Sequence, residues 1–394
     1  MRSLLLQVIA VTTINLKSIS QRLWLSLSTV VAVALVVIVL LAFLAMANGF
    51  QRTLAGSGSD DIAIFLRGGS QAEINSTVAR DQVRLIEDAP GIARGGDGKP
   101  LISPELYVVV DGVKRSSQTK ANLPLRGIGE QGVALRKGIT IAQGRMFNRG
   151  ANEIVVGKGL LKEFEGFEPG KTVTFATSRW TVVGTFEAEG SVFESEIWAD
   201  LPVVQSLFNR PNFVQTVRVR LESPSLAALK NYNDNDPRLK LDVKTEAAYF
   251  ADQAGQTTDL IQNLGWPLAI AMALGALAGA LNTMYSSVAA RAVEIATLRA
   301  IGFGGFPAFV GTLVESLVLA AIGGLIGAAA TWAIFDGLTA STLGGNFTQV
   351  VFAFQLSPAL IWQGVLLALA VGLIGGLFPA IRAARMPIVA GLYA

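Results

Sequence analysis

Clustered carboxylates are the first residues in this sequence whose types and spacing could do chemistry. Glu187, Glu189, Glu194 and Glu196 fall within one polar stretch, where two carboxylates could exchange a proton or hold a metal ion. The chain has no cysteine and no histidine, which excludes thiolate nucleophiles, histidine bases and the commonest zinc ligands. No nucleophile–base motif accompanies the glutamates, and carboxylates in loops are usually solvated. We therefore expect no catalytic residues, no metal site and no enzyme activity on this chain.

A second group of charges lies in the segment 291–306, "RAVEIATLRAIGFGGF", between two long apolar runs. As a helix it has two different faces, and the one opposite the charges carries alanines, a valine and a threonine. The charged face comprises Arg291, Glu294, Ile295, Leu298, Arg299 and Gly302, bordered by Ile301 and followed by Phe303. Such a helix fits a groove on a soluble partner, with charges fixing the register and apolar residues buried. The alternative is a charged extension of the preceding apolar run.

Glu315 is the only charged residue inside the apolar run 300–335. A charge inside a membrane costs about 3 kcal/mol, so such a residue is usually paired or functional. A proton or cation relay is one interpretation, but the apolar runs contain no second acid, no basic partner and no histidine. We expect instead a glutamate near one end of a span that reaches polar groups or stays protonated.

The elements that must position these residues are membrane-spanning helices. Only 15% of the residues are charged, against about 25% in an average soluble domain, and 51% are hydrophobic. A spanning helix needs about 20 apolar residues. Runs of at least this length occur at 23–47, 260–290, 300–335 and 356–381. The sequence therefore predicts four spans.

Basic residues give the expected orientation. They precede the first span, occupy the segment 291–306 and follow the fourth span, whereas 336–355 has no lysine or arginine. By the positive-inside rule both termini and 291–306 are cytoplasmic. Because these residues lie beside spans and the net charge is only +3, no nucleic-acid surface is indicated. The expected segments are a cytoplasmic or interfacial helix (1–22), spans at 23–47, 258–290, 307–335 and 356–381, an extracytoplasmic domain (48–257), a cytoplasmic helix (291–306), a short outer loop (336–355) and a cytoplasmic tail (382–394).

The large polar region between the first two spans predicts an α+β domain. Its ends combine alternating strand patterns, such as "VQTVRVRL", with short helical stretches, which suggests a split β-α-β layer. Its middle, about 121–205, is rich in glycine and short strands and predicts a β-rich insert. The expected fold class is thus a four-helix membrane protein with a large α+β extracytoplasmic domain.

Small residues recur at helical spacing within the spans. Pairs of glycines four residues apart let helix backbones approach closely in lipid. The pairs are Gly275 and Gly279, Gly323 and Gly327, and Gly372 and Gly376. We expect them in a tightly packed bundle or a dimer interface, unless they reflect the general abundance of glycine in membrane helices.

Several longer motifs resemble one family in combination. They are "RAVEIATLRAIGF" (291–303), "ESLVLAAIGGLIG" (315–327) and "GLFPAIRAARMPIVAGL" (376–392) in the membrane part, and "GRMFNRGANEIVVGKGL" (144–160), "WTVVGTFEAEGSVFESEIWADL" (180–201) and "LFNRP" (207–211) in the outer domain. These resemble the permease family of ABC transporters typified by the macrolide exporter MacB and the cell-division protein FtsX. The resemblance covers nearly the whole chain.

The resemblance implies a multi-pass protein of the bacterial inner membrane, paired with a second, identical or different permease chain. It implies a separate cytoplasmic ATPase subunit that binds ATP and Mg²⁺, because no phosphate-loop motif occurs on this chain. The helix matching 291–303 would be the coupling helix, and Glu315 matches a glutamate often found in the family's third span. The family also implies mechanotransmission, in which ATP-driven closure of the ATPase reshapes the outer domain.

Three functions are then open. The first is the permease of an exporter for a lipoprotein, lipid, peptide or drug, with a periplasmic adaptor and an outer-membrane protein as further partners. The second is a non-transporting regulator, similar to FtsX, that activates a periplasmic cell-wall hydrolase. The third, a membrane-anchored enzyme, lacks a catalytic constellation. The size of the outer domain and its β-rich insert favour the first.

Overall fold

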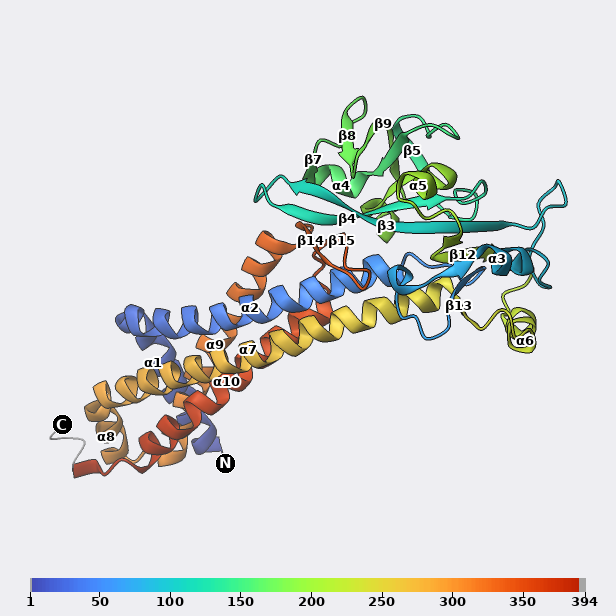
Figure 1. Cartoon of the computed structure of the whole chain (residues 1–394). Coiled ribbons are helices and arrows are strands. Elements are labelled where there is room, and N and C mark those ends of the chain that lie inside the picture. Colours follow the sequence, from blue (N-terminus) through green and yellow to red (C-terminus); the bar gives the residue numbers. More distant parts are fainter. Residues whose placement is uncertain (1, 390–394) are drawn as a thin grey trace. The chain divides into compact units, whose positions relative to one another are not determined.

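The computed structural model describes residues 2–389 as two compact units, each with its own contacts. The first unit comprises the described residues of 1–48, 260–338 and 354–394, and the second comprises 49–259 and 339–353. Residues 390–394, the end of the expected cytoplasmic tail and of the last family motif, lie outside the described residues. Figure 1 colours the chain along its sequence.

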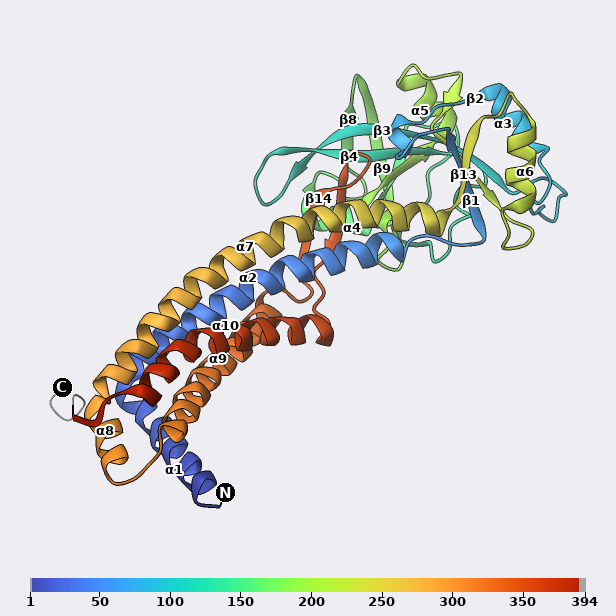
Figure 2. The ribbon, with the colours of Figure 1, turned by 90° about the horizontal axis from the view of Figure 1, so that it is seen from below.

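The first unit is helical. Its elements are α1 (Arg2–Ser18), η1 (Ile19–Arg22), α2 (Leu23–Ala55), α7 (Glu246–Ala290), α8 (Ala292–Ala300), α9 (Gly305–Phe335) and α10 (Pro358–Arg385), of which α2 and α7 continue into the second unit. Four helical stretches in the described chain are long and apolar enough to cross a membrane. Helices α9 and α10 lie side by side, and α1 packs against α9 (Figure 2).

Two helices are longer than the apolar runs that predicted them. The first span was expected to end at 47, but α2 continues to Ala55, and the second was expected to begin at 258, but α7 begins at Glu246. Neither extension contains proline, and an α-helix satisfies its own backbone hydrogen bonds in water as well as in lipid. Hydropathy therefore located the membrane-compatible part of each helix and not its ends.

The second unit is built on one mixed sheet of eleven strands. The strand order is β13-β1-β12-β3-β4-β10-β6-β9-β5, with β7 paired to β3 and β8 paired to β9. The strands are β1 (Ile62–Arg67), β3 (Ile102–Lys114), β4 (Lys120–Ile128), β5 (Thr140–Gly144), β6 (Glu153–Gly157), β7 (Phe164–Glu165), β8 (Thr172–Phe175), β9 (Ser178–Glu187), β10 (Ile197–Asp200), β12 (Thr216–Arg220) and β13 (Leu241–Thr245). The expected α+β class is confirmed, and the split layer and the β-rich insert are both parts of this one sheet.

Short helices and one small ladder complete the outer domain. They are α3 (Arg80–Glu87), α4 (Lys158–Glu163), α5 (Leu201–Leu207), α6 (Ala227–Asn235), the 3₁₀ turns η2 (Glu73–Asn75) and η3 (Val192–Ser195), and the paired strands β2 (Val78–Ala79) and β11 (Phe213–Val214). Two hydrophobic cores result. One lies under β4, β6, β9 and β10 and includes Trp180, and the other lies under β1, β12 and β13 and includes Phe65. We call them the insert core and the layer core.

The segment 336–355, expected to be a short loop, instead contains a β-hairpin. Its strands are β14 (Thr339–Leu343) and β15 (Gln349–Ala353), paired antiparallel from Thr339 opposite Ala353 to Leu343 opposite Gln349. The hairpin belongs to the second unit, and Val351 is part of the insert core. The β-branched and aromatic run "QVVFA" with the glycine turn before it was a strand signal that a loop assignment missed.

Candidate functional site

The segment expected to contact a partner folds into a short helix, α8. Arg291 caps its start, and the chain turns at Gly302, whose φ of 105° favours glycine. Val293, Glu294, Thr297 and the adjoining Ile301 are exposed, whereas Arg291, Ala292, Ile295 and Ala296 are buried. The exposed side therefore combines Glu294, from the predicted charged face, with Val293 and Thr297, from the opposite face.

Arg291 and Ile295 do not present a docking surface in this structure. The Arg291 side chain is ion-paired with Glu315 of α9, at 2.6 Å between Nη2 and Oε2. Ile295 packs with Val288, Ala308 and Ala383 in a small core of the first unit. The expectation that both contact a separate subunit is wrong for the described chain, because a helical wheel cannot tell a partner's groove from the protein's own bundle.

The pair supplies Glu315 with a basic partner from outside the apolar runs, in which the sequence showed none. Arg291 and Glu315 are 1% and 3% exposed, and Ser287 Oγ donates to the other carboxylate oxygen at 3.3 Å. Within the part of the chain that the structure describes, Arg291 Nε and Nη1 have no hydrogen-bond partner, and they adjoin a cavity of about 20 Å³ between α1, α8 and α9. A cavity of that size has room for one water molecule.

Three residues of the predicted docking segment, Leu298, Arg299 and Phe303, are intermediate in burial, and Gly302 is exposed. Leu298 and Phe303 line the same small cavity, together with Glu294 and Arg299. Arg299 also donates a hydrogen bond to the backbone oxygen of Met386, just beyond α10. Helix α8 is therefore joined to α9 through Arg291 and to the segment after α10 through Arg299.

Two of the three glycine pairs lie at helix contacts within the chain. A Cβ at Gly327 would be 2.7 Å from the Ala34 oxygen of α2, with Gly323 equally close to α2 one turn earlier. Gly372 and Gly376 face α9, where Ser316 Oγ donates to the Gly372 oxygen at 2.7 Å. In contrast, the remaining pair, Gly275 and Gly279 on α7, is exposed, and a Cβ there would meet no atom within 4 Å.

The four clustered glutamates of the outer domain do not converge. Glu187 pairs with Lys158, Glu194 accepts from the backbone amides of a turn, and Glu189 occupies the left-handed region at φ 52°. Glu196 alone is buried, so its assignment to a solvated loop is wrong. Among residues 2–389 no group of carboxylates is arranged to hold a metal ion.

Glu196 instead belongs to a buried network that the sequence analysis did not find. We call it the ionic cluster. Its members are Glu73, Glu105, Arg126, Arg136, Glu196, Arg218 and Glu246, all at most 6% exposed. With three arginines and four glutamates, it has one carboxyl group more than guanidinium groups. The only sequence signal was an arginine inside an apolar strand pattern, in "LPLRGI" and "TVRVR".

Glu105 is the common acceptor of the cluster. Its carboxylate lies 2.7 Å from Arg136 Nη2, 2.9 Å from Arg126 Nη1 and 3.0 Å from Arg218 Nε. Burial alone would raise the pKa of Glu105, but the three guanidiniums hold that pKa well below its usual range. Glu105 therefore stays ionised inside the domain.

The two ends of the cluster differ in charge balance. Arg126 and Arg218 hold the pKa of Glu73 below its ordinary value despite its complete burial. Burial raises the pKa of Glu246, and the single pairing with Arg218 only partly offsets this effect. Glu246 is the first residue of α7, the helix that continues into the first unit. The carboxyl group that the arginines compensate least is thus that of Glu246, where α7 begins.

The cluster lies between the two cores of the outer domain. Arg126 on β4 reaches Glu196 beside the insert core, at 2.7 Å, and also Glu73 of η2, at 2.7 Å. Arg218 on β12, beside the layer core, reaches Glu73 at 2.8 Å. A buried ion network contributes little net stability, but it costs several kcal/mol when one partner is removed. The network therefore adds charge contacts between two cores whose strands already share one sheet.

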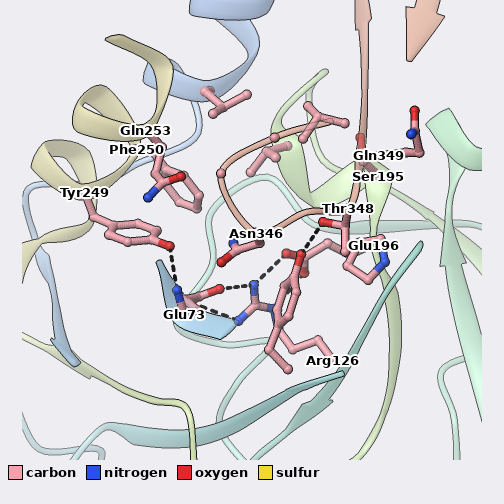
Figure 3. A pocket seen from close by; sticks show the side chains of 17 residues that line it. Glu73, Arg126, Ser195, Glu196, Tyr249, Phe250, Gln253, Asn346, Thr348 and Gln349 are labelled. Atoms are coloured by element: carbon pink, nitrogen blue, oxygen red, sulfur yellow. Dashed lines mark hydrogen bonds and ion pairs between the residues drawn. The ribbon is translucent and has the colours of Figure 1, made fainter. Parts of the chain in front are cut away.

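The tip of the β14–β15 hairpin closes over this cluster. Figure 3 shows Asn346 and Thr348 of the hairpin beside Glu73, Arg126 and Glu196. The Arg126 guanidinium carbon lies 4.9 Å from the centre of the Tyr107 ring, and the Tyr107 hydroxyl lies 2.7 Å from Thr348 Oγ1. The cavity left between the hairpin and the cluster is about 30 Å³, which is room for only a water molecule or two.

Comparison with known proteins identifies the parts of the chain. Residues 26–231, more than half of it, match the model of the MacB-like periplasmic core domain, and 267–388 match the FtsX-like permease C-terminal domain. A macrolide export ATP-binding/permease protein MacB 1/2 of Paracoccus denitrificans is 25% identical over 92% of this chain and 55% of its own length. MacB 2 of Yersinia pestis bv. Antiqua is 24% identical over 66% of this chain and 40% of its own length. The chain thus spans about half the length of these relatives.

Two solved structures are similar to the outer domain. The periplasmic region of MacB from Actinobacillus actinomycetemcomitans is 16% identical, with a TM-score of 0.38 over 52% of this chain and 94% of that one. The extracellular domain of the ABC-type transporter YknZ from Gram-positive bacteria is also 16% identical, with a TM-score of 0.34 over 47% of this chain and 99% of that one.

Proposed function

This chain belongs to the MacB/FtsX-like family of ABC transporter permeases, and on that premise we propose that it is the subunit that couples a cytoplasmic ATPase to its outer domain. ATP and Mg²⁺ would bind to the ATPase. The observation that carries the proposal is the way α8 is attached. One side of this helix is fixed to α9 by the buried Arg291–Glu315 pair, and the other side is exposed.

The exposed side of α8 is suited to a protein partner. Val293 is 49% exposed and Ile301 is 69% exposed, with Glu294 between them in the sequence. Burying an apolar side chain of this size contributes about 1.5–3 kcal/mol, and one charge beside it would set the register of docking. Because Arg291 holds the start of α8 against a span, displacement of α8 by an ATPase would move that span.

Single substitutions on the exposed side test this proposal. Val293→Asp and Ile301→Asp should abolish co-purification with the cognate ABC ATPase, or the ATP-driven activity of the complex, because each places a charge in the expected apolar contact. Ile141→Asp, at an exposed isoleucine of the outer domain, is the matched control and should leave pairing unchanged. Normal ATPase pairing in both α8 variants, with all chains folded, would reject the proposal.

We further propose a second permease chain beside α7. The exposed glycines Gly275 and Gly279 leave a smooth strip on which another membrane helix could pack closely. Whether that helix comes from an identical or a different chain depends on the partner's sequence. The proposed location is the bacterial inner membrane with both termini in the cytoplasm, in accordance with the positive-inside distribution.

Export is the favoured output. The relatives are named macrolide export proteins. The outer domain is built around both a layer core and an insert core, and a domain of this size offers a large surface. That surface could bind a lipoprotein, lipid, peptide or drug as substrate, or a periplasmic adaptor and outer-membrane protein as partners. The alternative is activation of a periplasmic cell-wall hydrolase. Deletion of the gene separates the two: hypersensitivity to an exported compound, or retention of a lipoprotein, supports export, whereas a division defect with normal efflux supports regulation.

A further inference from the structure

The β14–β15 hairpin makes up most of the chain between α9 and α10, and it belongs to the outer domain. Its strand β15 is buried along most of its length. Only 336–338 separate it from α9, and only 354–357 separate it from α10. Connections of three and four residues have little slack, because a residue spans at most about 3.5 Å.

The base and middle of the hairpin are fixed to the insert core. Val351 is buried in that core, and its backbone amide donates to Ser195 Oγ of η3 at 2.9 Å. Phe352 packs edge-on against Phe50, with ring centroids 5.6 Å apart. The Val351–Ser195 bond joins backbone to side chain in a buried place, where an unpaired polar group would be costly. The ring contact attaches the hairpin to Phe50 of α2.

The tip of the hairpin reaches the other half of the outer domain. Asn346 Oδ1 accepts from the backbone amide of Ile74 in η2 at 3.2 Å, next to Glu73 of the ionic cluster. On the side of β4, Asn122 Nδ2 donates to the Phe347 oxygen at 3.1 Å. The hairpin therefore contacts the outer domain on both sides of the ionic cluster, which lies between the insert core and the layer core.

We infer that this hairpin is a strap that stays seated in the outer domain and transmits displacements of α9 and α10 to the junction between its two cores. This deepens the proposed function, since it assigns a second route by which span movements reach the outer domain, beside α2 and α7. The first test uses the full chain alone in lipid nanodiscs. Because no ATPase is present, a negative result would reject the strap without bearing on the ATPase pairing.

The test uses a substitution that forces α9 and α10 slightly apart. Gly372→Ala places a methyl group against Ala320 of α9, and Leu373→Ala, at the neighbouring exposed side chain of α10, is the matched control. The readout is hydrogen–deuterium exchange of the amides of η2, 73–75. We expect exchange there to rise about tenfold in Gly372→Ala and to be unchanged in Leu373→Ala. Equal exchange at η2 in both variants would overturn the strap.

Added slack should then remove the effect. Flexible Gly/Ser linkers of about six residues between 338 and 339, and between 353 and 354, each add roughly 12–15 Å of free span. In this background Gly372→Ala should no longer change exchange at η2. The same linker placed between 96 and 97, in an exposed loop where nothing packs on Gly96, should leave the effect intact. A persisting effect in the chain with both hairpin linkers would contradict transmission through the hairpin.

Exchange of the Val351 amide decides whether the hairpin stays seated. This amide donates to the buried Ser195 Oγ at 2.9 Å, so it should exchange slowly only while the hairpin is docked. In the variant with both hairpin linkers the Val351 amide should remain as protected as in the wild type, which shows that its hairpin is still docked. In Gly372→Ala it should stay protected while exchange at η2 rises. Exchange that rises at Val351 together with η2 would mean that the hairpin acts by leaving its seat and would overturn the proposal.

Discussion

Arg291, at the junction of α7 and α8, donates from Nη2 to Oε2 of Glu315 in α9 across 2.6 Å, with both side chains almost fully buried. The pair joins a short exposed helix to the third long helix of the membrane unit. It explains how a charge in an apolar run and a charge in a polar turn are accommodated together, since each supplies the partner that the other needs.

Removing one partner of this pair should cost more than removing both. Glu315→Gln leaves the Arg291 guanidinium buried without its counter-charge, which should lower stability by about 3–5 kcal/mol. In Arg291→Met/Glu315→Gln the loss should be smaller than in either single variant, Arg291→Met or Glu315→Gln. Thermal unfolding of the four chains in one detergent measures the cycle. Additive losses would show that the two side chains do not interact.

The glycine contacts predict a positional contrast. Gly376→Leu should destabilise the single chain, because even the first added carbon, Cβ, would lie 2.6 Å from Ser316 Cβ of α9. Gly279→Leu should leave the isolated chain as stable as the wild type, since no atom lies within 4 Å of that site. If the strip on α7 binds a second permease, Gly279→Leu should weaken only the pairing, as measured by cross-linking in membranes. Unchanged pairing would place the second chain elsewhere.

Glu105 should be the most sensitive carboxyl group of the ionic cluster. Glu105→Gln removes the shared charge of three buried arginines and should lower the stability of the outer domain by about 3–5 kcal/mol. Glu246→Gln should cost much less, because the pKa of Glu246 is already raised by burial. Pulse proteolysis in urea, followed on outer-domain fragments of the full chain, gives both values. Equal losses would contradict this ranking.

Acid should weaken the outer domain. The pKa values of Glu73 and Glu105 are lowered in the folded chain, so the unfolded chain binds more protons, and stability is lost as the pH falls below about 4.5. Glu246 has the opposite sign: its raised pKa means that the folded chain binds the proton more tightly, and stability falls as the pH rises above about 4.5.

The opposite sign of Glu246 can be measured directly. Relative to the wild type, Glu246→Gln should become more favourable as the pH rises from 4.5 towards 7, because the variant no longer carries a poorly compensated buried charge. The urea midpoint of the variant minus that of the wild type, measured at several pH values, reports this trend. A difference that is constant with pH would show that Glu246 does not titrate in this range.

The sequence was most informative about the membrane helices and the family. Long apolar runs predict spans because lipid cannot satisfy a broken backbone, so length and composition suffice. The motifs around 291–303 and 144–201 identified the permease family, which the comparisons confirm. The exposed part of α8 was also within reach, because Glu294 and Ile301 sit in a polar turn where exposure is expected.

The tertiary structure alone decided which charges meet. Arg291 and Glu315 are adjacent only because α7, α8 and α9 fold back on one another, and the sequence assigned one to a partner protein and left the other unpaired. The ionic cluster draws on residues from Glu73 to Glu246, and the hairpin at 339–353 closes over it. Periodicity reports which side of one element is buried, whereas ion pairs between distant segments depend on how the elements are packed together. For this reason the sequence by itself determined the spans, the outer domain and the family, and only the packing revealed the buried pair and the seated hairpin.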